Sequence, residues 1–154
     1  MKILAIETSC DETAISVVET NDSSFKILSH VVHSQIDLHR EYGGVFPTLA
    51  KREHGKNLVP VLIKALQKAN LYKDAQNIDI SPDIKEFLSR NPELQESFTS
   101  SMHAISKPDI DYIAVTEGPG LEPALWAGIS FAKALNKLWG IPLIPVNQIG
   151  RAHV

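Results

Sequence analysis

The stretch DYIAVTEGPGLEPALWAGISFAKALNKLWGIPLIPVN, residues 111–147, decides the fold of this chain. It opens with a β-prone apolar run and a glycine turn, continues with apolar residues at helical spacing, and returns to a short apolar run. Gly140 closes the helical part, as glycine closes many helices. A strand, a helix and a second strand in succession form a βαβ unit, whose strands are parallel. We therefore expect strands at about 111–116 and 142–146 and a helix at about 123–139.

The first 70 residues predict a different arrangement. Apolar, β-prone runs at 2–7, 13–19 and 25–33 are separated by short polar turns, which predicts three antiparallel strands. Apolar residues then recur at helical spacing, which predicts a helix at about 48–70 that Pro60 kinks or splits. The full order is β-β-β-α-β-α-β. It predicts an α/β fold with a mixed sheet, the ribonuclease-H-like half used by actin-like ATPases.

The composition is that of one ordinary globular domain. The 154 residues are 44% hydrophobic and 21% charged, and a net charge of -3 does not by itself indicate a nucleic-acid partner. The single cysteine, Cys10, excludes an internal disulfide. No apolar run approaches the roughly 20 residues of a membrane span. We expect a cytoplasmic protein without a membrane partner.

Residues 72–108 interrupt this order with a polar, irregular stretch. Within it, Ser81-Pro82 and Asn91-Pro92 each combine a capping residue with a proline, the pattern of a helix N-terminus. We expect an insertion with two short, loosely packed helices set away from the catalytic face. Its deletion should then leave activity largely intact.

The polar turn ETSCDET, residues 7–13, joins the first two strands. Backbone N–H groups and hydroxyls at such a turn suit a phosphate, and adjacent carboxylates suit a base, an orienting group or a partner of a metal-bound phosphate. The candidate residues are Ser9, Cys10, Asp11, Glu12 and Thr13. A solvated acidic turn is the alternative, since the glycine usual in such loops is absent. Cys10 has no adjacent histidine, so we interpret it as a small buried packing residue rather than a nucleophile.

A second motif, HREYGGVFPTLAKREH at residues 39–54, connects the third strand to the first long helix. Its glycines permit close backbone approach, and its basic side chains suit an anion or nucleic acid. The candidate residues are His39, Tyr42, Gly43, Gly44, Arg52 and His54. The alternative is a linker followed by a solvated helix end, because Arg52 and His54 are two apart and do not share one helix face.

The third motif is the glycine turn at the end of the strand at 111–116. Ligands of open α/β sheets bind at the carboxyl ends of strands, and a helix N-terminus there offers N–H groups to a phosphate. The candidate residues are Gly118, Pro119, Gly120 and Leu121. A simple turn is the alternative, and the motif is not a Walker A loop. We expect the nearby Trp126, Phe131 and Trp139 to lie in the core.

Together the three motifs resemble those of one family. LAIETSCDETAISVV at 4–18, the second motif at 39–54 and the stretch 111–147 occur in the order and style of the TsaD family, the tRNA threonylcarbamoyladenosine transferases once called glycoproteases (Gcp). The resemblance covers residues 1–71 and 109–147. It leaves the stretch 72–108 outside.

The resemblance implies a two-lobed, actin-like enzyme. It implies transfer of a threonylcarbamoyl group from threonylcarbamoyl-adenylate to N6 of adenosine 37, in tRNAs that read codons beginning with A. It also implies a bound iron or zinc ion, a paralogous TsaB-like subunit and a TsaE-like small ATPase. Carried over by position, Asp11 and Glu12 match the catalytic acidic pair. The resemblance assigns the other candidate residues of the first and third motifs to substrate or nucleotide binding. It assigns those of the second motif to recognition of tRNA or substrate.

The last residues depart from the family pattern. Its signature continues with two metal-binding histidines four residues apart, but these positions hold Gln148 and Ala152, and His153 is out of register. IGRAHV, residues 149–154, is also one translation of a common sequencing adapter. We therefore expect residues 148–154 to be a non-native read-through tail on an N-terminal lobe, residues 1–147, whose C-terminal lobe is missing. Such a fragment should bind no metal and be inactive.

Two other functions fit parts of the sequence. A non-catalytic paralogue of the same tRNA-modification complex also lacks the metal histidines, but the second and third motifs read like the catalytic member. A sugar or acyl kinase of the actin-like superfamily would have an Asp-x-Gly turn in the first hairpin, which SCDET does not provide.

Overall fold

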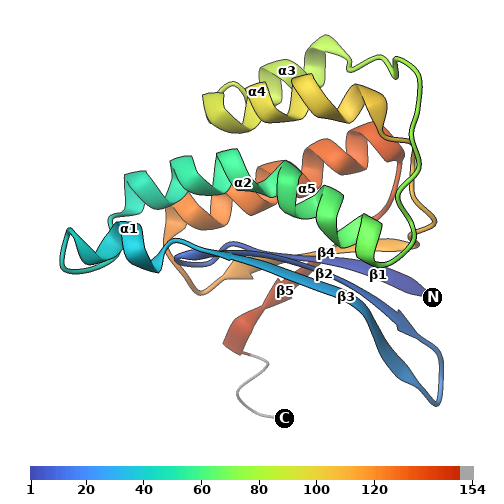
Figure 1. Cartoon of the computed structure of the whole chain (residues 1–154), viewed down its shortest axis with the longest axis horizontal. Helices are drawn as coiled ribbons and strands as arrows, with labels where there is room; N and C mark the ends of the chain where they lie inside the picture. Colours follow the sequence, from blue (N-terminus) through green and yellow to red (C-terminus); the bar gives the residue numbers. More distant parts are fainter. Residues whose placement is uncertain (150–154) are drawn as a thin grey trace.

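The computed structural model describes residues 1–149. The central element of this part of the chain is a five-stranded mixed sheet (Figure 1). The strands are β1 (Lys2–Glu7), β2 (Glu12–Thr20), β3 (Phe25–Ser34), β4 (Tyr112–Gly118) and β5 (Leu143–Asn147). Their order is β3-β2-β1-β4-β5; β2 is antiparallel to β1 and β3, while β4 pairs in parallel with both β1 and β5. The predicted strands and their directions are confirmed.

Alternation of side chains explains why these segments form one sheet. Leu4 and Ile6 of β1 are buried on one face, and Ile15 and Val17 extend the same apolar row onto β2. The buried row continues on β4, where Ile113 is fully enclosed. Burial of this face sets the strand register, because a slip of one residue would expose the whole row.

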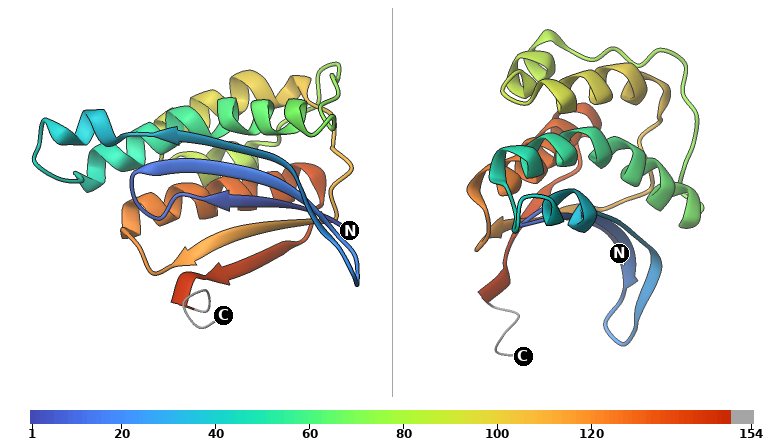
Figure 2. Two further views of the ribbon diagram at one scale, coloured as in Figure 1. Left: turned by 60° about the horizontal axis from the view of Figure 1, so that its bottom comes forward. Right: turned by 60° about the vertical axis from the view of Figure 1, so that its left-hand side comes forward.

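Two long helices, α2 (Pro47–Lys68) and α5 (Glu122–Trp139), cover that face (Figures 1 and 2). Both begin with a proline in the first turn, and Gly140 ends α5 with a left-handed φ of 68°. Pro60 lies inside α2, which continues through it as one helix, so of the kink or split that we expected the split is absent. Within residues 1–149 no helix covers the opposite sheet face (Figure 2) and none is long and apolar enough to cross a membrane.

The stretch 72–108 is packed into the core, so the prediction of a loose insertion is wrong. It forms α3 (Pro82–Leu88), α4 (Pro92–Ser101) and a short 3-10 turn, η1 (Met102–Ala104), stacked on α2 and α5 (Figure 2). Seven of its apolar side chains are at most 6% exposed: Ile80, Ile84, Leu88, Leu94, Phe98, Met102 and Ile105. Removing the segment would uncover this surface, so we no longer expect its deletion to be tolerated.

The crossing of α2 and α4 depends on a glycine. A Cβ atom at Gly55 would lie 2.5 Å from Asn91 Oδ1 and 3.0 Å from the Leu94 nitrogen, so no larger residue fits without displacing α4. Asn91 caps α4 as predicted, since its Oδ1 accepts from Leu94 N–H at 3.2 Å. Ser81 at the start of α3 makes no such side-chain hydrogen bond.

Replacing Phe98 tests the core role of the segment. Its ring is fully buried and meets Phe131 of α5 edge to face, with centroids 6.1 Å apart. We expect Phe98→Ala to lower the free energy of unfolding by about 3–5 kcal/mol, because truncation leaves a cavity. Glu96→Ala, an exposed change on the same helix, should stay within about 0.5 kcal/mol. Equal urea-unfolding midpoints for both variants would contradict the packing described.

Candidate functional site

The tip of the hairpin between β1 and β2 is held by its backbone carbonyl groups. Three successive carbonyl oxygens, those of Ser9, Cys10 and Asp11, accept hydrogen bonds from three different parts of the chain. Leu121 N–H donates to Ser9 at 2.8 Å and Gln35 N–H donates to Asp11 at 2.9 Å. His54 Nε2 lies 2.9 Å from the Cys10 oxygen. The first, second and third motifs therefore meet at this tip.

Gly120 makes the contact between the first and third motifs possible. A Cβ atom there would lie 2.6 Å from the Ser9 carbonyl oxygen, closer than a Cβ atom can approach. Thr8, the residue before Ser9, is hydrogen-bonded to α5. Its Oγ1 donates to Ala124 O at 2.8 Å and accepts from Gly128 N–H at 3.1 Å. The end of β1 is thus bonded directly to the start of α5.

His54 is a buried member of the second motif, fully enclosed beneath the hairpin. Because a carbonyl oxygen can only accept, Nε2 carries the proton that bonds Cys10 O. Nδ1 then accepts from the Thr13 hydroxyl, 2.7 Å away. Burial lowers the pKa of His54 below its ordinary 6.5, although the Cys10 carbonyl and the nearby carboxylates of Glu7 and Asp11 act in the opposite direction.

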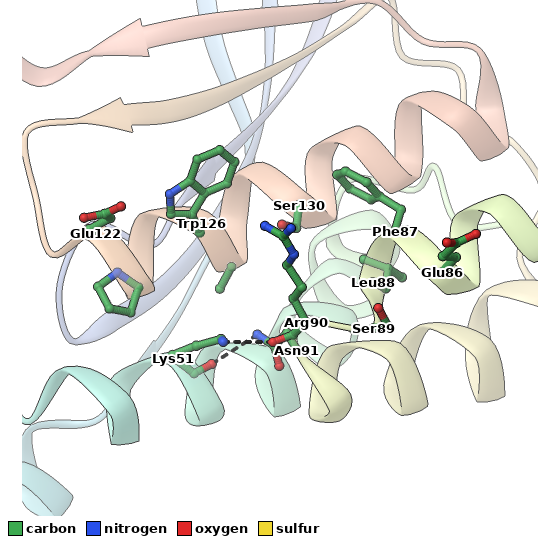
Figure 3. A pocket seen from close by; sticks show the side chains of 12 residues that line it. Lys51, Glu86, Phe87, Leu88, Ser89, Arg90, Asn91, Glu122, Trp126 and Ser130 are labelled. Carbon is green, nitrogen blue, oxygen red and sulfur yellow. Dashed lines mark hydrogen bonds between the residues drawn. The ribbon is translucent and has the colours of Figure 1, made fainter.

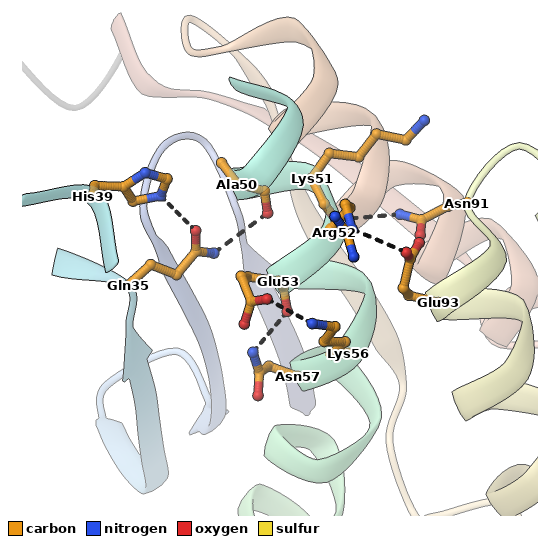
Figure 4. A network of polar contacts seen from close by, with 10 residues as sticks. All are labelled: Gln35, His39, Ala50, Lys51, Arg52, Glu53, Lys56, Asn57, Asn91 and Glu93. Carbon is orange, nitrogen blue, oxygen red and sulfur yellow. Dashed lines mark hydrogen bonds and ion pairs between the residues drawn. The ribbon is translucent and has the colours of Figure 1, made fainter. Parts of the chain in front are cut away.

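His39 is also buried, and a glutamine links it to the site (Figure 4). Gln35 Oε1 lies 2.8 Å from His39 Nε2, and the Gln35 amide nitrogen lies 3.4 Å from Ala50 O and 3.5 Å from His54 Nδ1. His39 Nδ1 accepts from Phe46 N–H at 3.1 Å. Both histidines are therefore enclosed in the lobe, and our expectation of anion contacts through their side chains is not supported by this placement.

The remaining residues of the second motif lie nearer the surface. Tyr42 is 62% exposed and stacks on Phe46, with ring centroids 5.7 Å apart. Gly43 has a φ of 70°, a conformation that favours glycine, and Gly44 lies in an open part of the loop. The Arg52 guanidinium forms an ion pair of 3.2 Å with Glu93 of α4 (Figure 4). The candidate residues of this motif that lie at the surface are therefore Tyr42, the two glycines and Arg52, whose side chain is 55% exposed.

Two acidic residues, Asp11 and Glu12, follow Cys10 at the hairpin tip. Asp11 is partly buried, and Glu12, the first residue of β2, is exposed. Cys10 is exposed, which corrects our prediction that it packs in the core. Partial desolvation and the neighbouring Asp11 carboxylate raise the pKa of the Cys10 thiol, so the thiolate needed of a nucleophile is disfavoured.

Glu7 is a site residue that the sequence analysis missed. Its carboxylate accepts from Ser9 N–H at 2.6 Å, from Gln148 Nε2 at 3.1 Å and from the Thr116 hydroxyl. Desolvation alone would raise the pKa of Glu7, but these donors outweigh it and lower the pKa. The available signal was a glutamate at the end of a central strand and at the first position of the polar turn.

The described residues do not fit a metal ion. Between residues 1 and 149 no three His, Cys, Asp or Glu side chains are placed to hold one. Gln148 uses its amide nitrogen as a donor to Glu7 and, at 2.9 Å, to Ser9 Oγ, and an amide N–H is not a metal ligand. Ala152, the second position of the expected histidine pair, lies outside the described residues.

The start of α5 offers a phosphate fewer N–H groups than we expected. Leu121 N–H already donates to Ser9 O, and Pro123 has no N–H. Glu122 adds a carboxylate to the first turn, where its charge opposes a bound anion. Within the glycine turn, Gly120 brings the backbone of the loop against the hairpin, whereas Gly118 has open space around it.

A separate cavity of about 760 Å³ lies between α2, α5 and the α3–α4 connection (Figure 3). Lys51 and Arg90 on its wall are offset by Glu86 and Glu122, so it has no marked preference for one sign of charge. Trp126 on this wall is 50% exposed, which corrects its predicted place in the core, and the Lys133 ammonium lies 5.7 Å from its ring centroid. Phe131 and Trp139 are buried as predicted.

Comparison with known proteins assigns the chain to a family. The family model for TsaD, tRNA N6-adenosine threonylcarbamoyltransferase, matches residues 26–80 and 91–153. The chain belongs to this family. A curated relative of that description from Persephonella marina is 44% identical over 154 residues, which are 100% of this chain and 34% of the relative. One from Thermomicrobium roseum is 43% identical over 149 residues, 97% of this chain and 31% of the relative.

The fold is shared with a solved structure of lower sequence identity. YeaZ from Pseudomonas aeruginosa superposes with a TM-score of 0.50 at 14% identity, over 95% of this chain and 43% of its own. The predicted actin-like half is thereby confirmed. The chain spans about a third of the length of the curated relatives named above. The family model includes most of 72–108 and passes over only 81–90, so the family likeness extends further than our motifs indicated.

The lowered pKa of His54 predicts how stability changes with pH. Since the unfolded chain takes up a proton near pH 6.5 and folded His54 only at lower pH, the unfolded state binds more protons in between. His54 thus contributes full stability above pH 6.5, and part of it is lost as the pH falls. We expect the unfolding free energy, measured in urea from pH 7.5 to 5, to fall more steeply for the original chain than for His54→Gln. Parallel pH profiles would show that His54 does not titrate differently on folding.

Proposed function

We propose that this chain supplies the N-terminal lobe of an enzyme that transfers a threonylcarbamoyl group from threonylcarbamoyl-adenylate to N6 of adenosine 37, in tRNAs that read codons beginning with A. Family membership supports the reaction. The observation that carries the assignment to this site is the anchored hairpin tip, where Ser9 meets the loop before α5 and Asp11 and Glu12 follow directly in the chain.

In this proposal the hairpin tip binds and orients the substrates, and its carboxylates accept a proton from the attacking amine or orient that amine. The carbonyl oxygens of Ser9, Cys10 and Asp11 are turned into the protein, which removes their partial negative charge from the surface that faces an anionic adenylate. Glu12 is exposed and free to accept a proton from, or orient, the attacking adenosine amine. Asp11, partly buried beside it, keeps the local charge and supports that orientation.

The same proposal includes partners and location. Besides tRNA and the adenylate, we propose a paralogous TsaB-like subunit and a TsaE-like small ATPase, acting in the cytoplasm and without a membrane. Tyr42 and the loop at Gly43 and Gly44 are exposed and offer a recognition surface for tRNA or substrate. His39 and His54 are buried and support that surface from within, whereas Arg52 lies exposed on α2, paired with Glu93, and adds a cationic group to it.

Carboxylate replacements in the whole enzyme test the proposal. We expect Glu12→Ala to lower the rate of threonylcarbamoyl transfer by about 10²–10⁴-fold, the usual effect of losing an acid–base group. Asp11→Ala should be milder, because Glu12 keeps part of the local charge. Neither variant should change the melting temperature appreciably, since both residues lie at a hairpin tip.

The assay is transfer to adenosine-37 tRNA with the partner proteins supplied. Asp22→Ala, in the exposed turn between β2 and β3, is the matched control and should leave the rate unchanged. A near-normal rate for Glu12→Ala would make the tip a structural turn.

For the metal, we propose that iron or zinc belongs to the whole enzyme and that this 154-residue chain binds either ion weakly or not at all. When bound, such an ion would act as a Lewis acid toward a substrate oxygen. The donor role of Gln148 toward Glu7 supports the proposal for the chain. Elemental analysis of the purified chain after dialysis should give far less than one ion per chain, and a stoichiometric ion would contradict this.

A further inference from the structure

Only one of the three anchors of the hairpin tip is a side chain. Leu121 and Gln35 hold the Ser9 and Asp11 carbonyl groups with their backbone N–H groups, which any residue except proline would provide. The Cys10 carbonyl instead depends on His54, which reaches it from α2, 44 residues along the chain. This anchor alone depends on the identity of a side chain.

We infer that His54 is a positioning residue for the proposed transfer, because its Nε2–H holds the Cys10 carbonyl and thereby fixes the backbone that carries Asp11 and Glu12. The inference rests on the proposed function. His54 is fully buried and bonded on both ring nitrogens, so it does not touch a substrate itself. Its effect on a reaction would pass through the tip.

The peptide unit between Cys10 and Asp11 explains why this anchor matters. A planar peptide carries the Cys10 carbonyl and the Asp11 N–H on opposite sides, so one cannot turn without the other. A carbonyl that loses its donor inside the protein is unfavourable and will turn toward water. The turn would present a carbonyl oxygen to the anionic adenylate in place of an N–H group, and would move both carboxylates.

The two nitrogens of His54 have separate tasks, which permits a matched pair of variants. Thr13 donates to Nδ1, and Nε2 donates to Cys10. A glutamine side chain is long enough to place an amide N–H near the former Nε2, so His54→Gln keeps the anchor and loses the acceptor for Thr13. An asparagine reaches only the position of Nδ1, so His54→Asn keeps that acceptor and loses the anchor.

The test is steady-state kinetics of the whole enzyme with its partners. We expect His54→Asn to lower kcat by about 10²-fold with KM for tRNA little changed, as for a small displacement of catalytic groups. His54→Gln should retain most of kcat. The melting temperatures of both variants are measured in parallel. His103 lies in η1, and the control variant His103→Asn should retain the original kcat. Equal losses for Gln and Asn, or losses that follow the melting temperatures, would reduce His54 to a packing residue and overturn the inference.

A second measurement does not depend on the reaction. In the 154-residue chain, ¹⁵N shifts of the imidazole should show His54 as the neutral form protonated on Nε2, in the chain and in His103→Asn alike. Protonation on Nδ1 would overturn the inference whatever the kinetics give. If the whole original enzyme transfers nothing to tRNA, the proposed function fails, and the imidazole spectrum alone then decides whether His54 anchors the tip.

Discussion

The hydrogen bonds to three successive carbonyl oxygens at the hairpin tip are the constraint on which the site depends. They require the start of α5, the residue before α1 (Ile36–Arg40) and the middle of α2 to converge on one turn. The position of α2 depends in turn on α4, which crosses it at Gly55, the residue next to His54. The stretch 72–108 therefore stabilises the helix that holds the site, although none of its residues reaches the tip.

Much of the fold could be predicted because local patterns and tertiary burial agree. The alternation in β1 and β2 and the glycine at the end of α5 carry enough information on their own. α3 and α4 were judged loosely packed because the stretch 72–108 is low in apolar residues and both helices are short. Phe98 and Leu88 become core residues only through contact with α5 and α2, which no window of sequence contains.

The site was predicted in outline and misjudged in detail for a similar reason. Residues of the three motifs do converge at the hairpin tip, but sequence does not distinguish a histidine that meets a ligand from one that supports a turn. His54 is buried because α2 lies across the base of the hairpin, and Cys10 is exposed because its backbone, rather than its side chain, faces inward. Glu7 was overlooked since its role arises from Ser9, Thr116 and Gln148, of which two are more than 100 residues away.

The bonds between the end of β1 and α5 have a mechanical consequence. Thr8 and Ser9 are successive residues, and three hydrogen bonds tie them to Leu121, Ala124 and Gly128 over the first two turns of the helix. A ligand that pulls on the tip therefore pulls on α5 as well, and the strand cannot slide along the helix without breaking all three bonds. The end of β1 and the first two turns of α5 should therefore move together, as one rigid unit, when a ligand binds at the tip.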